Sequence, residues 1–220
     1  MIQINLSQLH YSCMGETQPA LAQIPAMQRR RLSAVAKLAL HSAIQSLAGT
    51  TVDYIVWASQ YGDEAKTLKI LADVLQDQTP SPTLFSTSVH NAVAGLYSIL
   101  CQDATPSTSL CATWSEALIE AYAYLKTHAA TRVLLVYYDE PLPALYQEYR
   151  DFEGFALAAV LELDNANLSV DPEHAQPELE SLDPHSMSLE EHRFKYQDAL
   201  NFYQFWQQPN LTEQGGWRKC

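Results

Sequence analysis

Five segments of the chain have the hydrophobic pattern of β-strands. Residues 2–6 alternate apolar and polar side chains, as a half-buried strand does. Residues 52–58, 107–112 and 155–163 are short runs rich in apolar and β-branched residues. Residues 133–138 (Val-Leu-Leu-Val-Tyr-Tyr) are apolar without interruption, which indicates the centre of a sheet that is covered on both faces.

Helical patterns separate these strands. Ser33 is a candidate N-cap for a helix over residues 34–47, which Gly49 would end. Residues 63–75 have an amphipathic pattern, with Leu68, Leu71 and Leu75 on one face, and residues 91–101 and 115–127 are further helices. Strands that alternate with helices of this length predict an α/β fold, with a mostly parallel five-stranded sheet and helices on both faces.

The composition changes after residue 163. Residues 164–188 are rich in Pro, Asp, Glu, Asn, Ser and His, which predicts an acidic, solvated loop. Residues 189–206 have the pattern of a closing helix, and residues 215–220 are expected to form a tail. We therefore expect three parts: a main α/β unit over 1–163, the loop over 164–188, and the closing helix and tail over 189–220.

Composition and charge exclude several classes of function. A net charge of −12 with a pI near 4.9 is the wrong sign for binding nucleic acid. The basic run Arg29-Arg30-Arg31 is either a solvated helix start or a contact for a carboxylate-rich partner. The four cysteines and seven histidines have no metal-ligand spacing, so no metal is expected. No apolar run reaches the ~20 residues of a membrane span, and the N-terminus lacks a signal peptide, so we expect a cytoplasmic protein.

The segment over residues 82–117 resembles the nucleophile region of β-ketoacyl synthases. Asn91-Ala-Val-Ala-Gly-Leu-Tyr-Ser-Ile99 is similar to their helix N-x-V-A-G-x-x-[ST]-I, and Pro106 follows at the family's spacing. Counting on from Pro106 without a gap, the position of the family's catalytic cysteine falls on Trp114. Residues 136–140 (Val-Tyr-Tyr-Asp-Glu) match the family's Ala-Gly-Gly-x-Glu with tyrosines in place of the glycines. The resemblance implies the thiolase-like fold of the ketosynthase N-terminal half.

The chain also resembles the truncated, chain-length-factor-like subunits of bacterial aryl polyene gene clusters. The similar segments are residues 25–33, 81–91 and 138–143. This resemblance implies a non-catalytic subunit that forms a heterodimer with a full-length β-ketoacyl synthase and caps its acyl tunnel during polyketide elongation, a chemistry like that of type II fatty acid biosynthesis. The growing chain would be carried by a phosphopantetheinyl acyl carrier protein, and the subunit would need no cofactor of its own. Because carrier and subunit are both acidic, we expect the carrier to dock mainly on the ketosynthase.

Several residues have two interpretations at this stage. Trp114 is either an ordinary core aromatic or a plug that fills the vestigial acyl pocket. Cys111 is either a small buried residue on the strand or, with a three-residue shift, a nucleophile. His90 and Asn91 imitate a His/Asn catalytic pair, but neighbours on one element cannot converge on one nucleophile, so we expect buried interface roles.

The resemblance also assigns a tunnel wall. The positions that reach across the dimer toward the partner's acyl tunnel fall on Leu84 and Phe85, and Ile70, Leu71 and Val74 would add further wall. Two other functions stay open: an assembly scaffold without influence on the product, and an acyltransferase or decarboxylase that uses Cys111.

Overall fold

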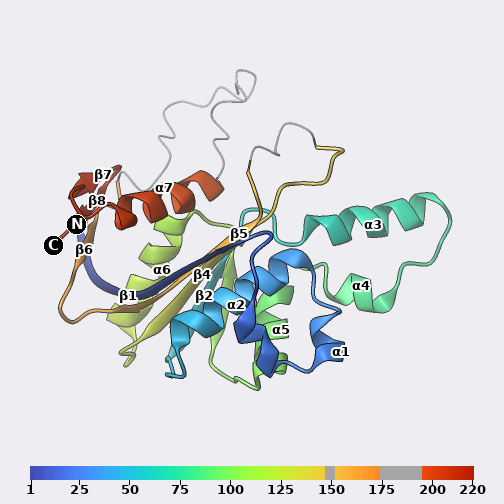
Figure 1. The fold of residues 1–220 in the computed structure, drawn as a ribbon, viewed down its shortest axis with the longest axis horizontal. Helices are drawn as coiled ribbons and strands as arrows, with labels where there is room; N and C mark the ends of the chain where they lie inside the picture. Colours follow the sequence, from blue (N-terminus) through green and yellow to red (C-terminus); the bar gives the residue numbers. More distant parts are fainter. Residues whose placement is uncertain (147–151, 174–194) are drawn as a thin grey trace.

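The computed structural model describes residues 1–146, 152–173 and 195–220, which form one mixed β-sheet with helices on both faces (Figure 1). In this described part the sheet has eight strands in the order β3-β2-β4-β5-β1-β6-β8-β7. The strands are β1 (Ile2–Cys13), β2 (Tyr54–Ala58), β3 (Ser107–Leu110), β4 (Val133–Asp139), β5 (Phe155–Glu162), β6 (Leu168–Val170), β7 (Glu213–Gln214) and β8 (Trp217–Lys219). The helices are η1 (Pro19–Gln23), α1 (Ala26–Arg29), α2 (Ala34–Leu47), α3 (Glu64–Leu75), α4 (Pro82–Ser86), α5 (Ala92–Cys101), α6 (Trp114–Thr127) and α7 (Lys195–Gln207).

The α/β class and the two helix layers agree with the sequence-based expectation, but the expected sheet was wrong in two respects. Only the β3–β2 and β2–β4 pairs are parallel, whereas β4–β5, β5–β1 and β1–β6 are antiparallel. Strands β4 and β5 are buried along nearly their whole length, and burial on both faces produces the same apolar run in either direction. The sheet also has more than five strands, because β6, β7 and β8 are too short to leave a pattern.

The two faces of the sheet have separate cores. On one face α2 and α5 pack on a cluster that includes Trp57, Tyr97 and Tyr138. On the other face α6 and α7 cover a cluster that includes Trp114, Tyr137 and Phe202. Residues of β4 therefore alternate between the two cores, as the two-residue period of a strand requires.

Helix boundaries follow the capping residues. The Ser33 side chain accepts a hydrogen bond from Ala36 N at the start of α2, as the sequence indicated. The helix ends at Leu47, and both Ala48 and the expected terminator Gly49 have positive φ. Helix α6 begins with a capping box, in which Thr113 and Glu116 exchange side-chain and backbone hydrogen bonds. This box fixes Trp114 as the first residue of α6.

The C-terminal residues are not the tail that we expected. Trp217 is buried, and β8 pairs with β6, which itself pairs with β1. The segment 164–173, expected to be loop, therefore contributes β6 to the sheet. The rest of the expected acidic loop (174–188), the first residues of the expected closing helix (189–194) and residues 147–151 lie outside the described residues.

Helices α3 and α4 project from the body of the molecule, and we call residues 64–86 the arm (Figure 1). Helix α3 packs chiefly on α4. The expected amphipathic face of α3 does not pack on the body, because Leu71 is 49% and Leu75 85% exposed.

Candidate functional site

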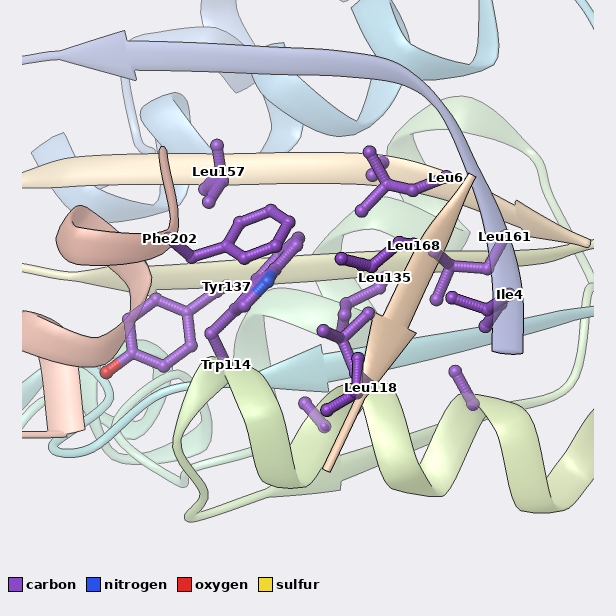
Figure 2. Packing of buried hydrophobic residues seen from close by; sticks show 14 of the residues in the cluster. Ile4, Leu6, Trp114, Leu118, Leu135, Tyr137, Leu157, Leu161, Leu168 and Phe202 are labelled. Atoms are coloured by element: carbon purple, nitrogen blue, oxygen red, sulfur yellow. The ribbon is translucent and has the colours of Figure 1, made fainter. Parts of the chain in front are cut away.

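Trp114 is the first residue of α6, directly after the turn from β3, and it is the position to which the spacing from Pro106 assigned the family's cysteine. Its side chain has no exposed surface, and its ring lies 5.2 Å from that of Phe202 on α7. Figure 2 shows Trp114, Tyr137 and Phe202 packed together beneath α7. Among the described residues the Trp114 Nε1 has no hydrogen-bond partner. The position of a strand-to-helix nucleophile is thus filled by an indole that is part of the core.

Cys111 lies beyond the end of β3 and is exposed, so the expectation of a buried strand residue was wrong. The strand ends at Leu110, and as an edge strand it has no buried residue even within its own length. The Cys111 thiol donates a hydrogen bond to the backbone carbonyl of Gln60, 3.3 Å away. A carbonyl oxygen accepts a hydrogen bond from a thiol without taking its proton, so this contact does not generate the reactive thiolate.

The tyrosines at the end of β4 fill the space on both sides of the strand. Tyr137 and Tyr138 are both buried, one in each core. The Tyr137 hydroxyl donates to Asp139 Oδ2 (2.6 Å), and the Ser59 hydroxyl donates to Asp139 Oδ1 (2.7 Å). Burial raises the pKa of Asp139, against the hydrogen bonds that lower it. Both large side chains are therefore part of the cores, and the Asp139 carboxylate joins the end of β4 to the residue that follows β2.

Helix α7 closes over the start of α6 through one carboxylate. Asp198 Oδ2 accepts from Ser115 N (2.7 Å), and Asp198 Oδ1 accepts from Ser115 Oγ (3.2 Å). The indole of Trp217 donates from Nε1 to Ser115 Oγ (3.0 Å). Burial raises the pKa of Asp198 to about 6, although the hydrogen bonds from Ser115 oppose this. Strand β8, helix α7 and helix α6 are thereby joined at the N-terminus of α6.

Strand β3 is an edge strand, and in the described part of the chain no strand lies beyond it. On its inner side Ile55 N donates to Pro106 O (3.0 Å) and Ser59 N donates to Leu110 O (3.1 Å). Because a parallel ladder uses alternate residues, the backbone groups of Ser107 and Ser109 point toward the open edge. An open edge of this kind is a template for pairing with another strand.

The surface around this edge is almost free of charge. Residues 79–115, which form α4, α5, β3 and the turn after it, contain one charged residue, Asp103, although charged residues make up 17% of the chain. Many of its residues are nonetheless exposed: Phe85, Val89, Asn91, Gly95, Ser98, Ile99, Gln102, Pro106 and Ser107. We call these residues the uncharged face. Depletion of charge at an exposed surface is typical of the centre of a protein–protein interface.

Gly95 lies in the middle of this face without an intramolecular reason to be glycine. It is within helix α5, and a Cβ added there would meet nothing within 4 Å. Glycine in a helix costs roughly 0.5–1 kcal/mol relative to alanine. With Asn91, Ala94 and Ser98 it lines a shallow groove of about 430 Å³ along β3. A groove of small side chains allows another backbone to approach closely.

The residues expected to form a tunnel wall lie together on the arm. Leu71, Val74 and Phe85 are 49%, 54% and 64% exposed, and Ile70 and Leu84 are half-buried. All five lie on α3 and α4, whereas Trp114 lies at the start of α6 in the core. The wall candidates and Trp114 are therefore on different elements.

His90 and Asn91 differ from each other in their surroundings. His90 is half-buried, and its Nε2 is bonded to the Ser59 carbonyl (3.1 Å). Asn91 is exposed and lines the groove beside Gly95, so its expected burial was wrong. Asn91 precedes the first turn of α5, in which Ala92 and Val93 take the buried positions, so its side chain remains at the surface.

Asp198 and Asp139 were missed by sequence reasoning. Each makes its contacts across about 80 residues of chain, to Ser115 and to Ser59 respectively. No local pattern encodes such contacts. An aspartate inside an otherwise apolar strand end was the one indication available for Asp139.

Two further observations concern the described residues only. No group of three or more His, Cys, Asp or Glu side chains there could hold a metal ion. None of the helices there is both long and apolar enough to cross a membrane.

The family model and the similar solved structures agree on the family of this chain. The family model described as β-ketoacyl synthase, N-terminal domain, matches residues 5–218. A search of curated protein sequences finds no match. Among solved structures, the chain is similar to one in a ketosynthase in complex with its chain length factor from Xenorhabdus doucetiae (ApeO with ApeC). The TM-score is 0.68 with 25% identity, over 78% of this chain and 83% of that one.

Two longer relatives share the fold. The ishigamide ketosynthase/chain length factor matches with a TM-score of 0.53 and 16% identity, over 73% of this chain and 55% of that one. A β-ketoacyl synthase from Burkholderia phymatum STM815 matches with a TM-score of 0.54 and 17% identity, over 75% of this chain and 53% of that one. The chain therefore spans about half the length of these two relatives.

Proposed function

The chain belongs to the β-ketoacyl synthase N-terminal domain family, and within it we propose a non-catalytic, chain-length-factor-like subunit. It pairs with an active β-ketoacyl synthase and caps the acyl tunnel of that enzyme during the elongation of aryl polyene or related polyketide chains. The observation that carries this proposal is the uncharged face around the open edge of β3. On a chain with a net charge of −12, such a face is suited to a partner rather than to water.

The geometry at the start of α6 supports the absence of condensing activity. Condensation needs a thiolate at the turn, and Trp114 fills that position from within the core. Cys111 is exposed, but its thiol is bonded to a carbonyl oxygen. Tyr137 is buried in the same core as Trp114. An acyltransferase that uses Cys111 is therefore the weaker alternative.

The comparisons support the choice of partner. The similar chain in the Xenorhabdus complex has nearly the length of this one, since 78% of one matches 83% of the other. The Burkholderia β-ketoacyl synthase is much longer. A short chain that resembles one member of a ketosynthase–chain length factor pair is suited to the same kind of assembly.

The arm supports a role in chain length. Its exposed apolar residues Leu71, Val74 and Phe85 lie on α3 and α4, and Phe85 also belongs to the uncharged face. Placed against the partner, they would form the end wall of its tunnel. Overpacking a rigid site costs ~1–3 kcal/mol, which disfavours one more two-carbon extension by roughly tenfold.

The acyl chain would arrive on the phosphopantetheine arm of a carrier protein, and this subunit would supply no cofactor. Since the subunit is strongly acidic, an acidic carrier would dock mainly on the ketosynthase, in the cytoplasm where both are made. This chain would then act on the product only through the wall that it presents.

Product length in the reconstituted complex tests the proposal. Phe85→Ala or Leu71→Ala in the arm should give longer products, and Leu71→Trp should give shorter ones, with a 1:1 complex retained. Leu145→Ala is the matched control, because Leu145 is 71% exposed and lies outside both the arm and the uncharged face. If the arm variants bind the ketosynthase normally and product lengths are unchanged, the subunit is an assembly scaffold instead.

A further inference from the structure

The arm is joined to the body through two short segments, which we call its roots. The first root, residues 59–63, leads from β2 into α3, and the second, residues 87–91, leads from α4 into α5. Because α3 packs chiefly on α4, the orientation of the arm depends on how these two roots are held. Both roots are held by hydrogen bonds that involve the side chains of Asp139, His90 and Lys66.

Asp139 fixes the first root. Its carboxylate accepts hydrogen bonds from Ser59 Oγ (2.7 Å), Gln60 N (3.0 Å) and Tyr61 N (3.2 Å). Gly62 N in turn donates to Ser59 Oγ (2.7 Å). The turn is therefore anchored to the end of the central strand β4 by one buried carboxylate.

His90 ties the second root to the first. Its Nε2 donates to the Ser59 carbonyl (3.1 Å), in the tautomer that places a proton on Nε2. Its ring lies against Gly62, where an added Cβ would come within 3.4 Å of His90 Cδ2. Gly62 has a φ of +67°, so a side chain there would be strained as well. The Tyr138 hydroxyl donates to the His90 carbonyl (3.4 Å) and links this root to β4 as well.

Lys66 makes a second connection between the roots. Its Nζ lies 2.6 Å from Asp63 Oδ2 and donates to Thr87 O (3.2 Å). A cation at the start of α3 thus bridges the first root to the residue that follows α4. His90 and Lys66 together close the base of the arm at two points.

We propose that His90 is a positioning residue that sets the angle of the arm, and through it the place of the wall that limits product length. This inference rests on the proposed function for its consequence, but the clamp itself is independent of any partner. Helix α3 has 12 residues and is therefore about 18 Å long. A rotation of about 5° at the roots would move its far end by about 1.5 Å, the length of a C–C bond. A small displacement at His90 would therefore move the far end of α3 by a distance that is large relative to the length of a two-carbon unit.

Hydrogen exchange on the full chain tests the clamp. His90→Ala should accelerate exchange of the amides over residues 59–66 by at least tenfold, while the amides of β4 and β5 keep their rates. His90→Gln should restore slow exchange, since the Nε2 of glutamine can donate to the same carbonyl. His128→Ala is the control, because His128 is exposed at the end of α6. Unchanged exchange over residues 59–66 in His90→Ala would overturn the clamp.

Product analysis of the ketosynthase complex tests the consequence. His90→Ala should broaden the product distribution, with at least a threefold change in the ratio of adjacent chain lengths, and His90→Gln should restore the narrow distribution. If Phe85→Ala shifts product length but His90→Ala does not, the positioning role is wrong and the proposed function stands. If neither variant changes the products, the proposed function is itself wrong, and the positioning role is overturned with it.

Discussion

Asp198→Asn separates two opposing effects at the start of α6. The carboxylate of Asp198 accepts hydrogen bonds from Ser115 N and Ser115 Oγ, which favours its charged form at a helix N-terminus. Its burial beneath α7 disfavours the charge, and burial is the stronger effect, because it raises the pKa to about 6 from 3.8. Asparagine keeps an acceptor for Ser115 N, and its amide can donate to Ser115 Oγ, but it carries no charge.

The magnitude follows from the pKa difference. A shift of about two units corresponds to ~3 kcal/mol between the two protonation states. Since the folded state holds its proton more tightly than the unfolded state, this group favours folding fully below about pH 4. Its contribution is lost as the pH rises toward 6 and is absent above that. At pH 7.5 the asparagine variant should therefore be more stable than the parent by up to ~3 kcal/mol, or by about 6–12 °C in Tm.

Thermal and urea unfolding of both chains between pH 4 and pH 8 measures this difference. The two chains should be about equally stable at pH 4 and should diverge as the pH rises through 6. Asp164→Asn is the control, because the same substitution there removes an exposed carboxylate instead of a buried one. An Asp198→Asn chain that is less stable than the parent at pH 7.5 would refute the reasoning, since the charge at the helix terminus would then outweigh its burial.

Three further predictions follow from other parts of the structure. First, intact mass after incubation with malonyl- or acyl-carrier protein, or with a cysteine-directed ketosynthase inhibitor, should show no adduct on Cys111, and a stoichiometric adduct there would contradict the non-catalytic role. Second, burial lowers the pKa of His10 and of His41, whose rings lie 5.1 Å apart. The contribution of this pair to the free energy of unfolding should therefore be complete above about pH 6.5 and decrease below it. The difference in unfolding free energy between the parent and His41→Gln should change across that range, and a difference that is constant with pH would rule this out. Third, cross-linking of the complex should attach the carrier's phosphopantetheine arm to the ketosynthase, and attachment mainly to this chain would overturn the docking prediction.

Motif spacing predicted a strand-to-helix turn beside Trp114, because strand length constrains where that turn falls. The distance from Pro106 to the helix start is set by one strand and one turn, so counting residues placed Trp114 next to the helix expected over residues 115–127, and α6 begins at Trp114 itself. The helix caps were predictable for the same reason, since capping at Ser33 depends on residues three apart. In these segments the structure depends on neighbouring residues, so the local sequence is enough to predict it.

Other features could not be read from the sequence because they depend on distant partners. The antiparallel pairing of β4 with β5 leaves the same apolar pattern as a parallel pair would. The amphipathic pattern of α3 predicted which face of the helix is apolar but not what that face would contact, and Leu75 on this face is largely exposed. Asp198 reaches Ser115 only because α7 folds back over α6. Such contacts depend on the topology of the whole chain.

The central claim, that this chain is the partner of a ketosynthase, is tested most directly by native mass spectrometry of the two proteins after co-expression. The account predicts a 1:1 complex for the parent chain and for Gln45→Glu, in which a charge is added to the exposed side of α2. Gly95→Glu places the same charge in the groove beside β3, and it should abolish the complex. The substitution should not unfold the chain, because Gly95 is a helical glycine with open space around it, and glutamate there should stabilise α5. A parent chain that stays separate from the ketosynthase, or a Gly95→Glu chain that binds it as well as the parent does, would contradict the claim.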